Sequence, residues 1–170
     1  LSAAMGIGEK FVRSDDAESN VSFTAPEAYV LIVDDNDINR AVAKGVIEPL
    51  GMQVDLAASG AECIEKVRNF RYDIIFMDHM MPEMDGLELC SNIKKDIRYS
   101  HIPIILLTAK ASEEHQLEGL NVGADDYITK PFNMEVLKLR INKIIEMNVK
   151  RQEIFNQEIK IEPSRITITP

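Results

Sequence analysis

Four short apolar runs in this chain each lead into residues that carry a carboxylate, a hydroxyl or an amine. Val30–Val33 precede Asp34 and Asp35, Ile74–Met77 precede Asp78, Ile104–Leu107 precede Thr108, and Tyr127–Thr129 precede Lys130. Short continuous apolar runs are typical of buried parallel strands. Because parallel strands present their carboxyl ends at one edge of a sheet, we expect these polar groups to meet there.

Apolar runs alternate with segments of helical periodicity five times between Tyr29 and Met147. This alternation is typical of βαβ units around a parallel sheet, so the pattern predicts an α/β fold. The weaker run Gln53–Ala57 alternates apolar and polar residues, which favours an edge strand.

Helix ends and buried helix faces follow from the same pattern. Ser59 and Glu62 have the spacing of a capping box, and Asn133 is placed to cap the last helix. A segment at 150–158 could extend that helix. Helical periodicity predicts that the following residues face inward: Ile38, Val42, Gly45 and Val46; Cys63, Ile64 and Val67; Leu89, Cys90, Ile93 and Ile97; Leu117 and Leu120; Leu137, Ile141, Ile144 and Ile145.

Composition limits the classes of function. The 170 residues suit one domain with modest extensions, and the net charge of −9 argues against nucleic-acid binding by this segment. The two cysteines, Cys63 and Cys90, are expected to pack in the core. No run is long and apolar enough to span a bilayer, so we expect a cytoplasmic location without direct membrane contact. A membrane anchor could lie in a longer parent protein.

The domain boundaries are predicted from changes in pattern. Residues 1–26 lack sustained periodicity and are interpreted as a linker, and residues 27–149 form the expected domain. Residues 150–170 are interpreted as a second linker, toward a domain absent from this chain, and its end, from Ile161, is expected to be extended.

The polar groups at the predicted sheet edge suggest phosphoryl chemistry. Three neighbouring carboxylates repel one another unless a cation lies between them, and Mg²⁺ prefers such oxygen ligands. We expect Asp35 and Asp78 to bind Mg²⁺ directly, Asp34 to bind it through water, and the Met80 carbonyl to complete the site. Asp78 is then the expected nucleophile toward a phosphoryl donor.

Two further groups would assist this reaction. Lys130 would pair with Asp78 at rest and with a phosphoryl oxygen afterwards. The Thr108 hydroxyl would donate to another phosphoryl oxygen after an inward loop movement, and Tyr127 would report the change by its rotamer. Taken singly, each of these residues has an ordinary structural interpretation, but their combination favours the functional one.

These residues resemble a known family. The acidic pair, Asp78 followed by Met80-Met81-Pro82-Glu83-Met84-Asp85-Gly86, Thr108-Ala109-Lys110, and Lys130-Pro131-Phe132 are similar in order and spacing to receiver domains of bacterial two-component systems. The resemblance implies a doubly wound, five-stranded, flavodoxin-like sheet and phosphorylation of Asp78 from a histidine-kinase phosphohistidine. It also implies a Thr108/Tyr127 switch and a cis Lys130–Pro131 bond.

The resemblance also implies partners. The histidine kinase domain could act in cis or in trans, and a homodimer through the 112–147 face is a hypothesis. The chain looks most like receivers of Bacteroides-type hybrid proteins, in which kinase, receiver and DNA-binding domain share one chain. DNA binding, and control of transcription, would then belong to a neighbouring domain.

Two alternatives stay open at this point. A Mg²⁺ phosphohydrolase of the haloacid-dehalogenase type would carry the covalent phosphate on Asp35, because Asp35-Asn36-Asp37 resembles its first motif. A phosphorylation-independent adaptor is the other, and its usual mark is the loss of an acidic residue or of the lysine. The only catalysis expected of the chain is its own phosphorylation and dephosphorylation, and a longer parent protein is expected to be a histidine kinase.

Overall fold

The computed structural model describes residues 28–109, 117–118 and 121–161. Within them, five strands pair in parallel as one sheet of order β2-β1-β3-β4-β5. The strands are β1 (Tyr29–Val33), β2 (Gln53–Ala57), β3 (Ile74–Asp78), β4 (Ile104–Thr108) and β5 (Asp126–Thr129). β2 lies at an edge, as its alternating pattern predicts.

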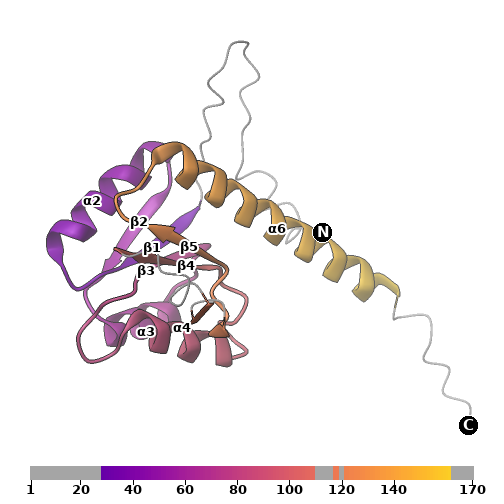
Figure 1. Ribbon diagram of the computed structural model, residues 1–170. Coiled ribbons are helices and arrows are strands. Elements are labelled where there is room, and N and C mark those ends of the chain that lie inside the picture. The colour runs from indigo at the N-terminus through magenta and orange to yellow at the C-terminus, as the bar shows by residue number, and fades with distance from the viewer. Residues whose placement is uncertain (1–27, 110–116, 119–120, 162–170) are drawn as a thin grey trace, which may run out of the picture.

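The described helices lie on both faces of the sheet. They are α2 (Asp37–Ile47), the 3₁₀ turn η1 (Glu48–Leu50), α3 (Gly60–Asn69), α4 (Gly86–Lys95) and α6 (Met134–Ile161). Helices α2 and α6 cover one face, and α3 and α4 cover the other (Figure 1). The predicted doubly wound, flavodoxin-like α/β fold is confirmed, and the strand order reverses between β1 and β3.

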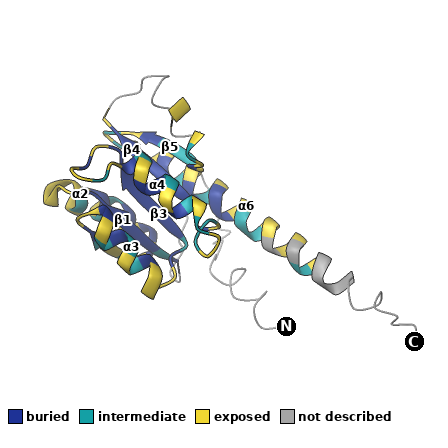
Figure 2. Cartoon of the chain, turned by 90° about the horizontal axis from the view of Figure 1, so that it is seen from below, coloured by how far each residue is buried: buried dark blue, intermediate teal, exposed yellow. Residues whose placement is uncertain are grey.

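Alternating side chains of the strands build a core on each face. Val30 and Ile32 of β1 pack in the cluster that contains Ile47 of α2 and Ile141 of α6. Leu31 of that strand packs in the opposite cluster, with Cys63 and Cys90 among its other members. Both cysteines are buried and unbonded, as expected. Figure 2 shows the result, with dark blue strands between helices whose outer faces are yellow.

The predicted caps are present. Ser59 Oγ accepts from the Glu62 N–H at 3.1 Å, and the Glu62 carboxylate accepts from the Ala58 N–H at 2.7 Å. Asn133 Oδ1 accepts from the N–H of Glu135 at 2.9 Å at the start of α6. Ser59 and Asn133 satisfy backbone donors that the first turn of a helix leaves without partners, whereas Glu62 binds the N–H one residue before the cap.

Three predictions of buried faces are wrong. In α2, Ile38 and Val42 are 72% and 53% exposed, whereas Ala43 and Ile47 are buried. The helix is therefore turned by one residue, about 100°, from the predicted orientation. Ile97 is 89% exposed because α4 ends at Lys95, and Leu117 is 61% exposed. Most of the helix expected around Leu117, with Leu120, lies outside the described residues.

Helix α6 is much longer than the sheet requires. Leu137, Ile141, Ile144 and Ile145 are buried as predicted, and the helix then continues past Met147 away from the sheet (Figures 1 and 2). The predicted helical extension at 150–158 is confirmed. The expected linker 1–26 and the stretch 162–170 lie outside the described residues. Among the described helices, none has both the length and the apolarity to cross a membrane.

Candidate functional site

Three carboxylates and one amine meet at the carboxyl edge of the sheet. Asp34 follows β1 and Asp78 ends β3, and one oxygen each of Asp34, Asp35 and Asp78 lies within 4.8 Å of the others. Lys130 Nζ, just after β5, lies 3.0 Å from Asp34 Oδ2 and 2.9 Å from Asp78 Oδ1. The structure thus brings together the four groups that the strand ends predict.

Burial differs strongly among the three carboxylates. Asp34 and Asp78 are only 2% and 7% exposed, whereas Asp35 is exposed. Burial raises the pKa of Asp78, and the charges of Asp34 and Asp35 act in the same direction, while Lys130 only partly offsets them. Burial alone would lower the pKa of Lys130, but its hydrogen bonds to Asp78 and Asp34 raise it, so it is held as a cation.

The turn between β1 and α2 is fixed by side chains of α2. Asp34 Oδ1 accepts from the Asn36 N–H at 2.9 Å and from the Asn39 amide at 3.4 Å. Arg40 Nη1 donates to the Asp34 carbonyl oxygen at 2.6 Å. Asn36 also caps the helix through the N–H groups of Ile38 and Asn39. Sequence reasoning missed Asn39 and Arg40 as parts of this site, and their only signal is their position in the first turn after the acidic pair.

The loop after Asp78 folds back tightly against it. The Gly86 N–H donates to the His79 carbonyl at 2.9 Å. A Cβ atom at Gly86 would overlap the Asp78 carbonyl oxygen and lie 3.0 Å from His79 Cα. A side chain at position 86 would therefore displace the backbone that carries Asp78.

The remaining predicted residues surround this cluster. Thr108 ends β4 and is buried, one position beyond Leu107, which pairs in register with Asp78. Tyr127 is half-buried on β5, and the side chain of Met80 is 73% exposed. The Lys130–Pro131 bond is cis, as the family resemblance implies. Lys110 lies outside the described residues.

The donor set fits a hard divalent cation. All three groups offer carboxylate oxygens, which Mg²⁺ prefers, and Asp35 is exposed to solvent. The buried Asp34 and Asp78 share a single Lys130 ammonium, so their negative charge is only partly compensated.

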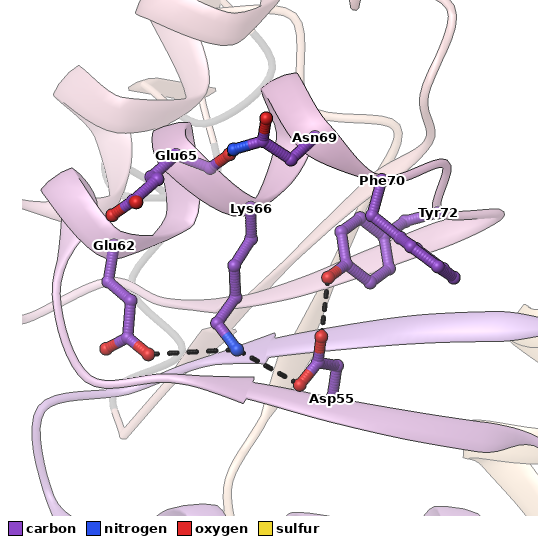
Figure 3. A pocket seen from close by; sticks show the side chains of 7 residues that line it. All are labelled: Asp55, Glu62, Glu65, Lys66, Asn69, Phe70 and Tyr72. Carbon is purple, nitrogen blue, oxygen red and sulfur yellow. Dashed lines mark hydrogen bonds and ion pairs between the residues drawn. The ribbon is translucent and has the colours of Figure 1, made fainter.

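A separate recess of about 350 Å³ lies between β2 and α3 and includes none of these carboxylates (Figure 3). It is lined by Asp55, Glu62, Glu65, Lys66, Asn69, Phe70 and Tyr72. Lys66 Nζ contacts Asp55 at 3.1 Å and Glu62 at 3.8 Å, and the Tyr72 hydroxyl donates to Asp55 at 2.6 Å. Because these polar groups satisfy one another, the recess is interpreted as a structural network at the edge strand.

Comparison with known proteins yields one family match and similar curated proteins. The sequence model of the family described as the response regulator receiver domain matches residues 30–142. Histidine kinase P4 of Formosa agariphila is 36% identical over 158 residues, which are 93% of this chain and 12% of that protein. The transcriptional regulatory protein SrrA of Staphylococcus aureus is 37% identical over 116 residues, 68% of this chain and 47% of that protein.

A solved structure extends the likeness to three dimensions. The chemotaxis protein CheY4 of Vibrio cholerae is 35% identical, superposes with a TM-score of 0.65, and is matched over 69% of this chain and 98% of its own. The chain thus spans less than half the length of the two curated relatives, but 98% of the chain in this solved structure is matched.

Proposed function

Because the chain belongs to the response regulator receiver domain family, we propose that it accepts a phosphoryl group on Asp78 from the phosphohistidine of a histidine kinase. The observation that carries this proposal is the contact of Asp78 with Lys130 beside two further carboxylates. A carboxylate at a strand end, next to a fixed cation, can attack phosphorus in line. The phosphorus–nitrogen bond of the phosphohistidine breaks as the bond to an Asp78 oxygen forms.

We propose Mg²⁺ as the cofactor of this step. Asp35 and Asp78 would bind it directly, Asp34 through water, and the Met80 carbonyl would supply a backbone ligand. When bound, the ion neutralises charge that develops on the phosphoryl oxygens. The three carboxylate oxygens within 4.8 Å of one another support this assignment.

Lys130, Thr108 and Tyr127 would turn phosphorylation into a signal. Lys130 already contacts Asp78, so its ammonium is in place to pair with one phosphoryl oxygen. The Thr108 hydroxyl would donate a hydrogen bond to a second phosphoryl oxygen. The half-buried Tyr127 would change rotamer as the loop after β4 moves. An added phosphoryl group is a local charge change that can bias such a loop.

The parent protein and its partners are a further part of the proposal. Similarity to a histidine kinase over 93% of this chain and to a transcriptional regulatory protein over 68% supports a kinase partner, in cis or in trans, and output through a neighbouring domain. Dimerisation through the 112–147 face is proposed as one route of output. Sizing by light scattering with and without a phosphoryl mimic tests it, and an unchanged mass would contradict it.

The hydrolase alternative has less support. It requires the covalent phosphate on Asp35, but Asp35 is exposed, whereas Lys130 contacts Asp34 and Asp78. The adaptor alternative expects the loss of an acidic residue or of the lysine, and all four are present.

Intact-mass analysis after incubation with a small phosphoryl donor tests the proposal. A single adduct that requires Mg²⁺ and is lost in Asp78→Asn is expected. An adduct that persists in Asp78→Asn and is lost in Asp35→Asn would instead support the hydrolase. No adduct in the parent chain would support the adaptor.

A further inference from the structure

Arg40 differs from the other residues at the start of α2, because its side chain turns back to the backbone of Asp34. Its side chain is only 13% exposed, although α2 presents neighbouring side chains to solvent. One guanidinium nitrogen, Nη1, donates to the Asp34 carbonyl oxygen at 2.6 Å, and Nη2 pairs with Asp37. A partly buried guanidinium that donates one nitrogen to a backbone carbonyl holds that peptide group in a fixed direction.

The peptide group in question is the one that joins Asp34 to Asp35. Its plane sets the direction in which the Asp35 Cα and side chain leave β1, because a peptide unit is rigid. The Asp34 end is separately fixed, since the Asp34 N–H donates to the Ala57 carbonyl at 3.1 Å and its carboxylate binds Lys130.

Asp35 has no comparable support of its own. No hydrogen bond or ion pair to another described residue holds its exposed carboxylate, yet one of its oxygens lies within 4.8 Å of oxygens of Asp34 and Asp78. Its approach to the cluster therefore depends on the backbone of the turn. Among the described residues of α2, Arg40 is the one whose side chain contacts this backbone directly, and the Asn36 N–H, which donates to Asp34 Oδ1 at 2.9 Å, holds the turn on the other side of Asp35.

We infer that Arg40 is a positioning residue that holds the Asp34–Asp35 peptide so that Asp35 reaches the divalent cation beside Asp78. This inference rests on the proposed function, because it concerns the cation that the carboxylates would bind. Groups that orient metal ligands typically change metal affinity by about 10- to 100-fold when they are removed. A role in helix stability alone would change the free energy of unfolding and leave cation affinity unaltered.

The test compares Arg40→Met, Arg40→Lys and Asp37→Asn with the parent in the full 170-residue chain. Isothermal titration calorimetry gives the Kd for Mg²⁺, and urea unfolding in EDTA gives stability without the ion. Asp37→Asn is the matched control, because it removes the guanidinium's other partner and leaves the contact with Asp34. The side chain of Asp37 is 89% exposed, so this pair is expected to contribute little.

We expect Arg40→Met to raise the Kd for Mg²⁺ about 10-fold. Arg40→Lys should recover part of this loss, since an ammonium can still donate to the Asp34 carbonyl, and Asp37→Asn should bind as the parent does. A Kd for Arg40→Met equal to that of the parent, with or without a change in stability, would overturn the inference. If Arg40→Met does not fold, the comparison of Arg40→Lys with Asp37→Asn decides, and equal Kd values for these two variants would overturn it.

Failure of the proposed function would give a different set of Mg²⁺-binding results. It would appear as a parent chain that binds no Mg²⁺, or as an Asp35→Asn variant whose Kd equals that of the parent. Either result would remove the cation site itself, and with it the role of Arg40. Loss of binding in Asp35→Asn together with unaltered binding in Arg40→Met would leave the site intact and reject only the positioning role.

Discussion

Gly86 occupies the point where the loop after β3 touches the backbone of the candidate nucleophile. Because a Cβ there would overlap the Asp78 carbonyl oxygen, Gly86→Ala must shift the backbone on which Asp78 lies. Such overpacking should lower the free energy of unfolding by about 1–3 kcal/mol and slow phosphorylation of Asp78. Urea unfolding and intact-mass kinetics measure the two effects.

Gly45 provides a matched control for this substitution. It lies in the exposed part of α2, and a Cβ added there would meet nothing within 4 Å. Gly45→Ala should therefore raise the free energy of unfolding by about 0.5–1 kcal/mol, because alanine has the lower entropic cost in a helix. Equal stability of Gly86→Ala and the parent would contradict the close approach at Asp78.

A second prediction at the residue scale concerns how the free energy of unfolding depends on pH through Asp55 of β2. Partial burial by itself raises the pKa of Asp55, but the hydrogen bond from Tyr72 and the ion pair with Lys66 outweigh it and hold the pKa below its ordinary value. A lowered pKa in the folded state contributes stability above the unfolded value of about 3.9, and this contribution is lost as pH falls through the folded value.

Tyr72→Phe removes the hydroxyl that lies 2.6 Å from this carboxylate, closer than Lys66 at 3.1 Å. At pH 7 we expect a loss of about 1 kcal/mol in the free energy of unfolding, small because the Asp55 side chain is 49% exposed. The loss should be smaller at pH 2.5, because a larger fraction of the Asp55 carboxylate is protonated there than at pH 7. Urea unfolding at the two pH values measures it, and an equal loss at both would show that the contribution of the Tyr72 hydroxyl does not depend on the charge of Asp55.

At the scale of elements, the boundaries were more predictable than the orientations. The edge strand β2, the Ser59 cap and the Asn133 cap follow from local chemistry, so the sequence predicts them well. The rotation of α2 about its axis could not be predicted from local chemistry. Ile38 and Val42 are at least as apolar as Ala43, which is buried in their place. The choice between two adjacent apolar stripes is made by packing against the sheet, which no local pattern contains.

The candidate site likewise contains residues that the sequence predicts and one that it does not. Asp34, Asp78 and Lys130 were predictable because strand ends must meet at one edge of a parallel sheet. Arg40 was not, because its contact is with a backbone carbonyl, and a backbone atom has no signature in the sequence.

Helix α6 allows one substitution to be tested in two settings. Ile144 packs in the core and is 6% exposed, whereas Ile154, on the part that continues beyond the sheet, is 58% exposed. Ile144→Ala should lower the free energy of unfolding by about 2–4 kcal/mol, and Ile154→Ala by less than about 0.5 kcal/mol. Both are measured by urea unfolding followed by circular dichroism. A comparable loss in Ile154→Ala would show that the second half of α6 packs against a partner in solution.

At the scale of the whole molecule, the strand-end cluster opposes folding stability in the absence of a cation. Two nearly buried carboxylates and a third beside them share one lysine, and the pKa of Asp78 is raised mainly by its burial and then by its acidic neighbours. Asp78→Asn removes one of these charges. Without Mg²⁺ we expect it to raise the free energy of unfolding by about 0.5–2 kcal/mol.

Mg²⁺ should reverse this order if the cluster is a cation site. An ion that binds only the folded chain, at about 100 times its Kd, adds about 2.7 kcal/mol to the parent and much less to a variant that lacks one ligand. Urea unfolding of both chains in EDTA and in Mg²⁺ measures the crossing, with Glu65→Gln, an exposed carboxylate of the β2–α3 recess, as the control that should follow the parent throughout. If Asp78→Asn gained as much from Mg²⁺ as the parent, the ion would bind elsewhere, and the raised pKa of Asp78 would be a property of the fold without a role in phosphoryl transfer.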